Sequence, residues 1–404
     1  MSNHQPKVAF VSGCNGISGH AIVEHLVRQP DSEWSKIIVS SRTPLVHFWS
    51  DPRVQFVGVD FMWPHERIVE KLAPVCSLVT HVYYTAYAHS KDFKSLSKIN
   101  VPLFQKFIDA VDAVCPKLQR VLMYTGGKYY GAHLGKLTAP AEESSPRYID
   151  NGDNFYYNQE DYLVEVQQRR KQWKYNVIRP TGIIGFIPHG SLLVLIFLSL
   201  ITHEYTYAAN GMSEALSVAV YFLLCRELGL PAHFPGNEFL WEGVDDKSYA
   251  PSIADLAVFA STHDHCSNQI FNHTNGDVIV WKNFWPKIAQ YYGLKTPTPR
   301  FEQARGQSSN LIVEFNVQEW ADDKKPAWER VVQKYGGRKD VFDWVSWDHW
   351  NWALGRAWST LLSSNKARAY GWTRFDDTYK TWLDTWTILE NAGILPKPQP
   401  LGEI

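Results

Sequence analysis

The 404-residue sequence lacks an excess of charge, a cysteine framework and a long hydrophobic run. Its 40 basic and 41 acidic residues give a net charge of −1, so charge provides no reason to expect nucleic acid or an anionic membrane as a partner. Its five cysteines show no paired spacing, which predicts neither disulfides nor a zinc site. The longest apolar run, residues 192–201, is shorter than the roughly 20 residues that span a bilayer.

These absences are typical of a protein from a reducing compartment. The polar start, residues 1–6, has no signal-peptide character, so we expect a cytoplasmic protein with no membrane span and no metal. The run 192–201 is expected to be a buried core helix, the wall of a substrate pocket, or both. The oligomeric state stays open, and a homodimer is one candidate.

A glycine-rich turn follows the first predicted strand. Residues 7–11 form a short apolar run typical of a buried parallel strand. Gly13, Gly16 and Gly19 then keep G-x-x-G-x-x-G spacing, and a helix begins within this segment. In dinucleotide-binding folds such glycines allow a tight turn, a close approach to the pyrophosphate and close helix packing. The helix N-terminus offers its N–H groups to the phosphates, so the segment predicts a nucleotide site.

The second predicted strand ends with an arginine where an acid is common. Residues 36–40 form this strand, and Ser41 and Arg42 follow. NAD-dependent enzymes place Asp or Glu near this point, where it binds the ribose hydroxyls. An arginine can instead pair with a 2′-phosphate through its planar fork. We therefore expect NADPH/NADP⁺ as cofactor; the alternative is that Arg42 is a solvated loop residue.

Strands keep alternating with helices to about residue 185. Further strands are expected at 54–60, 79–84, 120–125 and 176–179, with an amphipathic helix at about 101–114. This order predicts an α/β fold, a Rossmann-like doubly wound parallel sheet. Asp60 is placed to contact the adenine, Thr85-Ala86-Tyr87 to line the cofactor groove, and the turn 179–185 to hold the nicotinamide.

The remaining sequence is mostly helical and predicts a second region. A helical stretch runs to about residue 230, a loop covers 231–236, and 239–241 resembles a strand. A helix at 250–260 and a strand at 270–273 follow. Five tryptophans between 344 and 358 favour a packed core over a ligand groove. We expect residues 1–188, completed by about 237–275, to form the NADPH-binding domain, and 189–236 and 276–404 to form a mainly helical substrate-binding region.

The helix after residue 154 lacks the lysine of a short-chain dehydrogenase. Those enzymes carry Tyr-x-x-x-Lys, which puts both side chains on one helix face. Here Glu160 stands four residues after Tyr156, and Asp161 four after Tyr157. A carboxylate cannot lower the pKa of a phenol, which is ordinarily about 10. A lysine occurs upstream instead, at Lys128, so the pattern predicts a changed reaction on a familiar scaffold.

These segments carry a family resemblance over nearly the whole chain. The specific matches are Thr125-Gly126-Gly127-Lys128-Tyr129-Tyr130-Gly131 and Asn154-Phe155-Tyr156-Tyr157 with Glu160-Asp161. With the glycine turn, Ser41-Arg42 and Arg179-Pro180, they make the chain resemble the progesterone 5β-reductase/iridoid synthase-like (PRISE) family. This family is an atypical branch of the extended short-chain dehydrogenases. The segment 131–134 departs from the plant enzymes and is more similar to fungal members.

The resemblance implies NADPH-dependent 1,4-reduction of the C=C bond of an enone or enal, with a small hydrophobic carbonyl compound as substrate. It implies Tyr156 and Lys128 as the catalytic pair. A tyrosine hydroxyl aimed at the carbonyl oxygen is an oxyanion-hole donor for the enolate, and Lys128 would polarise it and orient the ribose. The predicted cofactor contacts are Gly13, Asn15, Gly16, Ile17, Ser41, Arg42, Asp60, Phe61, Thr85, Ala86, Tyr87, Thr125, Gly126, Tyr156, Pro180 and Ile183.

Other residues are alternative candidates for the catalytic groups. Tyr124 and Lys128 satisfy the Tyr-x-x-x-Lys spacing, but Tyr124 belongs to a predicted strand and two glycines intervene, so they would not share a helix face. Tyr157 is the alternative phenol, because element boundaries are uncertain by a few residues. His133 and His189 are alternative acid or base groups, since histidine titrates in the right range.

Two further functions remain open. A cyclase or isomerase on the same scaffold would act on a reactive carbonyl intermediate. A non-catalytic NADPH-binding protein would need only the nucleotide site, and the presence of both Lys128 and Tyr156 argues against it.

Overall fold

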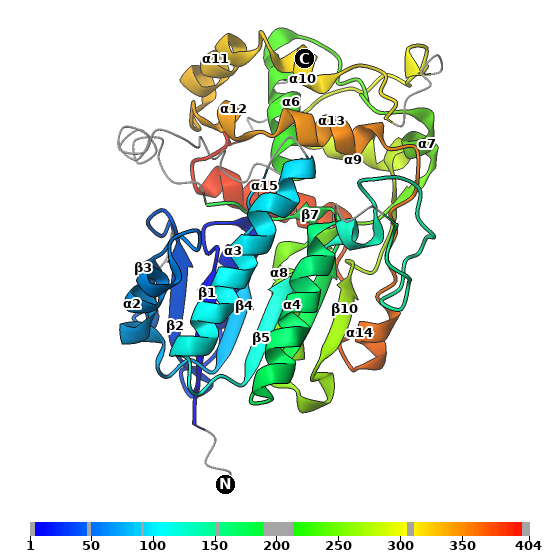
Figure 1. The fold of residues 1–404 in the computed structure, drawn as a ribbon. Coiled ribbons are helices and arrows are strands. Elements are labelled where there is room, and N and C mark those ends of the chain that lie inside the picture. Colours follow the sequence, from blue (N-terminus) through cyan, green and yellow to red (C-terminus); the bar gives the residue numbers. More distant parts are fainter. Residues whose placement is uncertain are drawn as a thin grey trace.

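The computed structural model describes residues 5–46, 50–89, 93–149, 154–188, 213–304 and 311–397. It has a lower part built on a parallel sheet and an upper part built mainly of helices (Figure 1). The predicted run 192–201 and His189 lie outside the described residues. Among the described helices, none is both long and apolar enough to cross a membrane.

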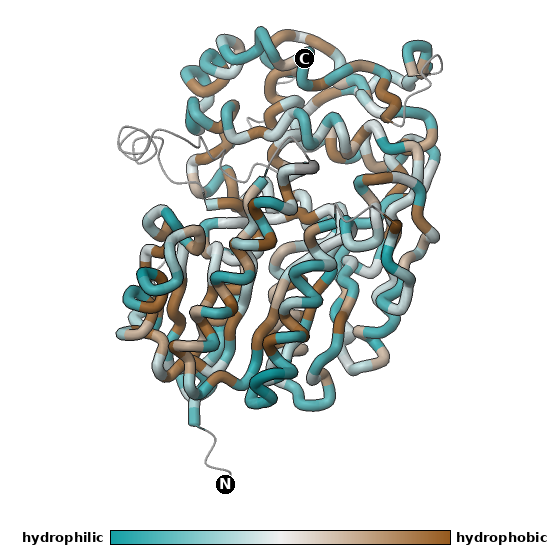
Figure 2. The backbone as a smooth tube through the Cα atoms, in the orientation of Figure 1, coloured by the Kyte–Doolittle hydropathy of each residue, from teal (hydrophilic) through white to brown (hydrophobic). Residues whose placement is uncertain are grey.

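A seven-stranded parallel sheet confirms the predicted fold class. Its order is β10-β6-β5-β4-β1-β2-β3. The strands are β1 (Lys7–Ser12), β2 (Trp34–Ser41), β3 (Val54–Gly58), β4 (His81–Tyr84), β5 (Arg120–Tyr124), β6 (Lys174–Pro180) and β10 (Gln269–His273). The central strands β1, β4 and β5 are mainly apolar and buried, because helices cover both faces of the sheet. The strands accordingly carry much of the hydrophobic colour in the lower part of the molecule (Figure 2).

Helices cover the two faces of the sheet in separate groups. On one face α1 (Ile17–Val27) packs against α8 (Ala250–Thr262). On the other, α2 (His65–Cys76), α3 (Phe93–Val114) and α4 (Phe155–Arg170) lie in a row (Figure 1). The sheet reverses its winding at β1, which pairs with β2 on one side and β4 on the other. Such a reversal opens a crevice at the carboxyl ends of the strands, where ligands bind in open α/β sheets.

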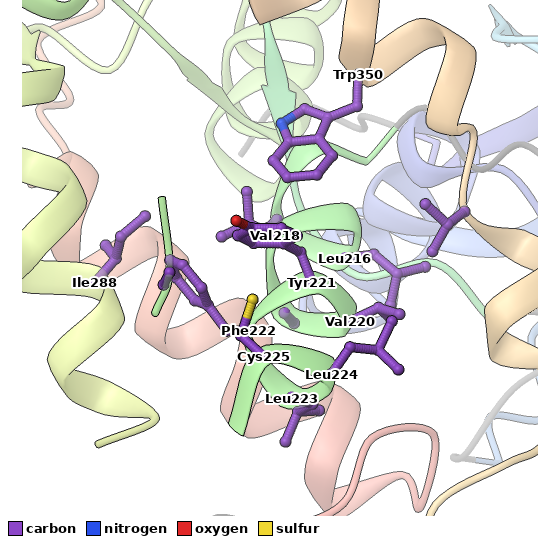
Figure 3. Close-up of a cluster of buried hydrophobic side chains, with 14 of the residues drawn as sticks. Leu216, Val218, Val220, Tyr221, Phe222, Leu223, Leu224, Cys225, Ile288 and Trp350 are labelled. Atoms are coloured by element: carbon purple, nitrogen blue, oxygen red, sulfur yellow. The ribbon is translucent and has the colours of Figure 1, made fainter. Parts of the chain in front are cut away.

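The upper part has a hydrophobic core of its own, centred on α6 (Glu214–Leu228). Eleven consecutive residues of this helix are buried, so it is apolar around its whole circumference and must be enclosed by other elements. Figure 3 shows its side chains pointing in several directions, with Ile288 and Trp350 coming from neighbouring helices.

The remaining elements of the described residues are η1 (Gly127–Tyr130), β7 (Ile183–Ile184), α7 (Glu238–Glu242), β8 (Val244–Asp245), β9 (Ser248–Tyr249), η2 (Asp264–Cys266), β11 (Ile279–Val280), α9 (Trp281–Tyr291), α10 (Val317–Ala321), α11 (Lys325–Tyr335), α12 (Val341–Trp344), α13 (Trp347–Gly355), α14 (Asn365–Ala369) and α15 (Thr378–Asn391).

One predicted element is wrong in type. Residues 239–241 resemble a strand in sequence, but they lie in the short helix α7. The Asn237 side chain caps this helix by accepting a hydrogen bond from the Leu240 N–H. Capping by Asn at this position favours a helical start over the local β-propensity of Phe239 and Trp241.

A buried ion pair joins α4 to β6. Glu160, which occupies the position of the missing lysine, accepts hydrogen bonds from Arg179 at 2.7 and 3.0 Å. Arg179 is fully buried, and its guanidinium lies 3.2 Å above the Tyr129 ring centre. Burial raises the pKa of Glu160, and the charge of Arg179 opposes that rise. Each charge therefore depends on the other for compensation.

Glu160→Gln should destabilise the protein by about 3–5 kcal/mol, because it leaves the buried Arg179 charge uncompensated. The matched control is Asp161→Asn, which breaks the exposed pair between Asp161 and Arg147. That change should cost less than about 1 kcal/mol, since water screens exposed pairs. Chemical denaturation measures both values. If both substitutions lowered the free energy of unfolding by the same amount, the buried pair would not stabilise the protein more than the exposed pair does.

Candidate active site

A cavity of about 230 Å³ lies at the carboxyl ends of the central strands and reaches α13 in the upper part. Its walls come from the start of α1, from the loops after β4, β5 and β6, from the start of α4, and from α13. The predicted residues that line it are Gly16, Ile17, Thr85, Ala86, Tyr87, Thr125, Gly126, Lys128, Tyr156, Pro180 and Ile183. The structure therefore brings both predicted catalytic residues together with most of the predicted cofactor contacts.

The glycine turn is built for close backbone approach. Gly13 has a positive φ of 68°, and a Cβ there would lie 3.0 Å from the backbone of Ala86. A Cβ at Gly19 would lie 2.3 Å from the Gly13 carbonyl oxygen, so neither position tolerates a side chain. The α1 N-terminus at Gly16 has no side-chain cap and no acid in its first turn. This cradle fits the pyrophosphate of a dinucleotide, since the first N–H groups of a helix bind anions.

Asn15 ties the glycine turn to the end of β2. Its side-chain amide donates to the Ser41 hydroxyl at 3.0 Å and to the Pro44 carbonyl at 2.8 Å. Arg42 follows Ser41 directly and is exposed. Gly13, Asn15, Ser41 and Arg42 do not line the cavity, but this contact holds Ser41, the residue before Arg42, against the glycine turn. The contact of Arg42 with a nucleotide stays a prediction.

Two further predicted cofactor contacts, Asp60 and Phe61, lie apart from the cavity wall. The Asp60 carboxylate accepts a hydrogen bond from the Met62 N–H at 2.9 Å. Phe61 is buried and packs edge-on against Phe107, with ring centres 5.0 Å apart. For Phe61 the structure shows a packing role, and for Asp60 a local turn; their contact with a nucleotide stays a prediction.

The catalytic candidates meet at the junction of η1 and α4. Lys128 donates a hydrogen bond from Nζ to the Tyr87 hydroxyl at 3.0 Å and lies 5.3 Å from the centre of that ring. Tyr156 is in the first turn of α4, and its hydroxyl would be 3.9 Å from a Cβ built on Gly126. Burial, and then the neighbouring phenols of Tyr87 and Tyr84, raise the pKa of Tyr156 well above its ordinary value. Tyr156 therefore remains protonated and can donate a hydrogen bond at neutral pH.

Asn154 connects these elements, a role that the sequence did not reveal. Its amide nitrogen donates to the Lys128 carbonyl at 2.6 Å and to the Tyr129 carbonyl at 3.3 Å. Its oxygen accepts from the Tyr156 N–H at 3.3 Å and so caps α4. The signal in the sequence was a good N-cap residue before a helix, but its link to Lys128 depends on how the chain folds back.

Three alternative catalytic groups, Tyr157, Tyr124 and His133, can be located in the structure. The Tyr157 hydroxyl donates to the Tyr129 carbonyl at 2.6 Å and accepts from the Tyr148 N–H at 2.7 Å, and this residue does not line the cavity. Tyr124 is the last residue of β5, so it shares no helix with Lys128. Burial, and then Lys128, lower the pKa of His133 to about 3, which leaves it neutral at physiological pH.

The sequence patterns did not predict the charged residues that form another wall of the cavity. Lys247 contacts Asp245 at 2.7 Å and Glu214 at 2.9 Å, and all three line the cavity. The same segment supports the loop after β6, because the Ser248 N–H donates to the Gly182 carbonyl at 3.1 Å. Asp246, Arg356 and Trp352 complete this wall. These residues come from separate segments of the sequence, so no single motif predicted them. Trp352 also shows that the tryptophan-rich segment serves the cavity as well as the core.

Comparison with known proteins agrees with this architecture. Residues 9–343 match the profile of the PRISE-like Rossmann-fold domain. The chain belongs to the PRISE family. This confirms the resemblance read from the sequence and assigns the chain to an oxidoreductase family of the short-chain dehydrogenase type.

Relatives match over nearly their whole length. The short chain dehydrogenase gsfE of Penicillium aethiopicum is 41% identical, and the match covers 97% of this chain and 100% of that one. The (S)-8-oxocitronellyl enol synthase of Nepeta racemosa is 27% identical over 93% of this chain and 91% of its own. The 3-oxo-Δ(4,5)-steroid 5β-reductase of Arabidopsis thaliana is 26% identical, with coverages of 93% and 91%. The higher identity to the fungal protein agrees with the fungal resemblance of the sequence.

Solved structures share the fold at low identity. The terminal R domain from the myxalamid PKS-NRPS pathway matches with a TM-score of 0.62 and 13% identity, over 98% of this chain and 94% of that one. The Bordetella bronchiseptica enzyme WbmH in complex with NAD⁺ matches with a TM-score of 0.58 and 13% identity, over 96% and 99%. These similarities support the Rossmann-type fold alone.

Proposed function

We propose that the protein is an NADPH-dependent reductase that catalyses the 1,4-reduction of an α,β-unsaturated ketone or aldehyde. The observation that carries this proposal is the arrangement around Tyr156. Its protonated phenol and Lys128 line the same cavity as the glycine turn, while the helical lysine of an ordinary dehydrogenase is replaced by the buried Glu160. Relatives named as a steroid 5β-reductase and an enol synthase support the same reaction class.

Each group of the site has a task in this reaction. The N–H groups at the start of α1 bind the pyrophosphate, and Arg42 pairs with the 2′-phosphate. NADPH, when bound, supplies a hydride to the β-carbon of the conjugated carbonyl. Tyr156 donates a hydrogen bond to the carbonyl oxygen, where negative charge develops as the enolate forms. Lys128 strengthens this stabilisation with its positive charge, and the α-carbon takes its proton from solvent.

The proposed reaction assigns different parts of the chain to the cofactor and to the substrate. Residues 1–188, completed by about 237–275, would bind the cofactor, because this part contains all seven strands of the described sheet. Residues 189–236 and 276–404 would contribute most of the substrate-binding region, in which α13 already reaches the cavity. Such an enzyme would act in the cytoplasm, where NADPH is available.

A second candidate is a cyclase or isomerase that acts on a reactive carbonyl intermediate at the same site. The observation that favours it is the name of a relative, an enol synthase, which describes an enol product. A bound enolate can react further before a proton reaches its α-carbon.

Product identity tests the proposed reaction. The purified protein should consume NADPH with α,β-unsaturated ketones or aldehydes and release the saturated carbonyl compound, with little oxidation of simple secondary alcohols by NADP⁺. Absorbance of the reduced cofactor and product mass provide the measurement. An allylic alcohol as the main product would show 1,2-reduction and reject the proposal. An isomer of the substrate without net NADPH loss would favour the second candidate.

Loss of the Tyr156 hydroxyl should reduce turnover strongly. Tyr156→Phe should lower kcat by about 10²–10³, the loss typical of one oxyanion-hole donor, while NADPH binding persists. Tyr157→Phe is the matched control, because its hydroxyl is engaged by the backbone outside the cavity. It should change stability more than kcat. If Tyr157→Phe were the damaging substitution, the assignment of the pair would be off by one residue.

Arg42 should set the choice of cofactor. Arg42→Asp should shift the preference from NADPH toward NADH, because the acid repels the 2′-phosphate and can accept from ribose hydroxyls. Dissociation constants for both nucleotides, measured by fluorescence, give the preference as a ratio. An unchanged ratio would remove Arg42 from the nucleotide site.

A further inference from the structure

Lys128 is hydrogen-bonded to another residue of the cavity wall. Its Nζ donates a hydrogen bond to the Tyr87 hydroxyl at 3.0 Å, and the same ammonium lies 5.3 Å from the centre of the Tyr87 ring. Tyr87 follows β4, whereas Lys128 belongs to η1 after β5. Both residues line the cavity, and the contact joins the segments that follow two neighbouring strands, β4 and β5, at the edge where the substrate would bind.

The Tyr87 hydroxyl has an unused donor. A phenol can accept one hydrogen bond and donate another. Its oxygen accepts from Lys128, and within the described part of the chain no acceptor for its O–H proton is found. Because an ammonium that donates to the oxygen polarises the O–H bond, Tyr87 becomes a stronger donor toward the cavity.

Tyr87 is also close to the Tyr156 phenol. After burial, Tyr87 is the first neighbour that raises the pKa of Tyr156. Phe155, the residue before Tyr156 in α4, contacts both rings, with its ring centre 6.0 Å from that of Tyr87 and 4.2 Å from that of Tyr156. Two phenols from different elements thus share one end of the cavity, and the ammonium contacts the one outside α4.

We propose that Tyr87 is a second hydrogen-bond donor to the substrate carbonyl oxygen, and that Lys128 acts on the reaction through Tyr87. The oxyanion site then consists of two phenols, Tyr156 and Tyr87. Lys128 is a positioning residue that orients and polarises Tyr87. The assignment deepens the proposed function and rests on it for the identity of the reacting oxygen. No bond changes partner at Tyr87, whose proton stays on its own oxygen.

Binding of an oxyanion tests this without turnover. The probe is 4-nitrophenol, whose phenolate oxygen resembles an enolate oxygen and whose ionisation is visible in its absorption spectrum. It is titrated into the protein saturated with NADP⁺. Tyr87→Phe should weaken phenolate binding by about tenfold or more, the usual loss for a hydrogen bond to a charged group. Binding of 4-nitrotoluene, which keeps the nitro group but has a methyl group in place of the phenolic oxygen, should not change by more than about twofold.

A double-mutant cycle separates the two routes by which Lys128 could act. Lys128→Met should weaken phenolate binding in the wild-type and Tyr156→Phe backgrounds. In the Tyr87→Phe background the same substitution should have little further effect. Tyr157→Phe is the control for loss of a phenol outside the cavity and should leave the phenolate affinity within about twofold of wild type. Thermal unfolding of each variant shows that it folds.

The outcomes are distinct. A Lys128→Met effect that persists in Tyr87→Phe and disappears in Tyr156→Phe would overturn the inference and return Lys128 to Tyr156. Unchanged phenolate affinity in Tyr87→Phe would also overturn it. If no enone is reduced by the wild-type protein while the phenolate cycle behaves as expected, the proposed reaction fails but the two-phenol oxyanion site stands.

Discussion

The buried ion pair between Glu160 and Arg179 is the constraint on which the site depends. It fixes α4, which carries Tyr156, to β6, whose carboxyl end leads into the cavity. Arg179 also donates to the Tyr130 hydroxyl at 3.1 Å and lies against the Tyr129 ring, so the same cation holds η1 in place. A charge pair in this environment is costly to bury and costly to break. Its geometry therefore leaves little freedom in how the three elements meet.

Glu160, at the position where short-chain dehydrogenases carry a helical lysine, reverses the charge there and changes the packing. A lysine at this position would face Arg179 inside the protein, where like charges are strongly unfavourable. A lysine that lines the cavity, Lys128, comes instead from η1, which is held by the bonds of Asn154 to the carbonyls of Lys128 and Tyr129. Tyr156 is left buried and protonated, a state suited to stabilising an oxyanion and poorly suited to accepting a proton from an alcohol.

The cavity combines two kinds of wall. One is formed by aromatic side chains and the backbone of the strand ends, and the other by the buried charges around Lys247. Lys247 pairs with Asp245 and Glu214, and the adjacent Ser248 supports the loop after β6 by donating its backbone N–H to the Gly182 carbonyl. The upper part of the molecule thus does more than cover the cavity. Its own core, centred on α6, supports the residues that face the lower part.

The sequence by itself determined the parallel sheet, the glycine cradle and the membership in the PRISE family. These features depend on local patterns: apolar strand runs, glycine spacing, and short motifs around Lys128 and Tyr156. Its errors were local as well, as at 239–241, where the Asn237 cap outweighed β-propensity. Only the tertiary structure decided that Lys128 contacts Tyr87, that Glu160 meets Arg179, and that Asp245, Lys247 and Arg356 face the cavity. Those contacts join residues far apart in the chain, and pairing between distant elements leaves no periodic trace in a single sequence.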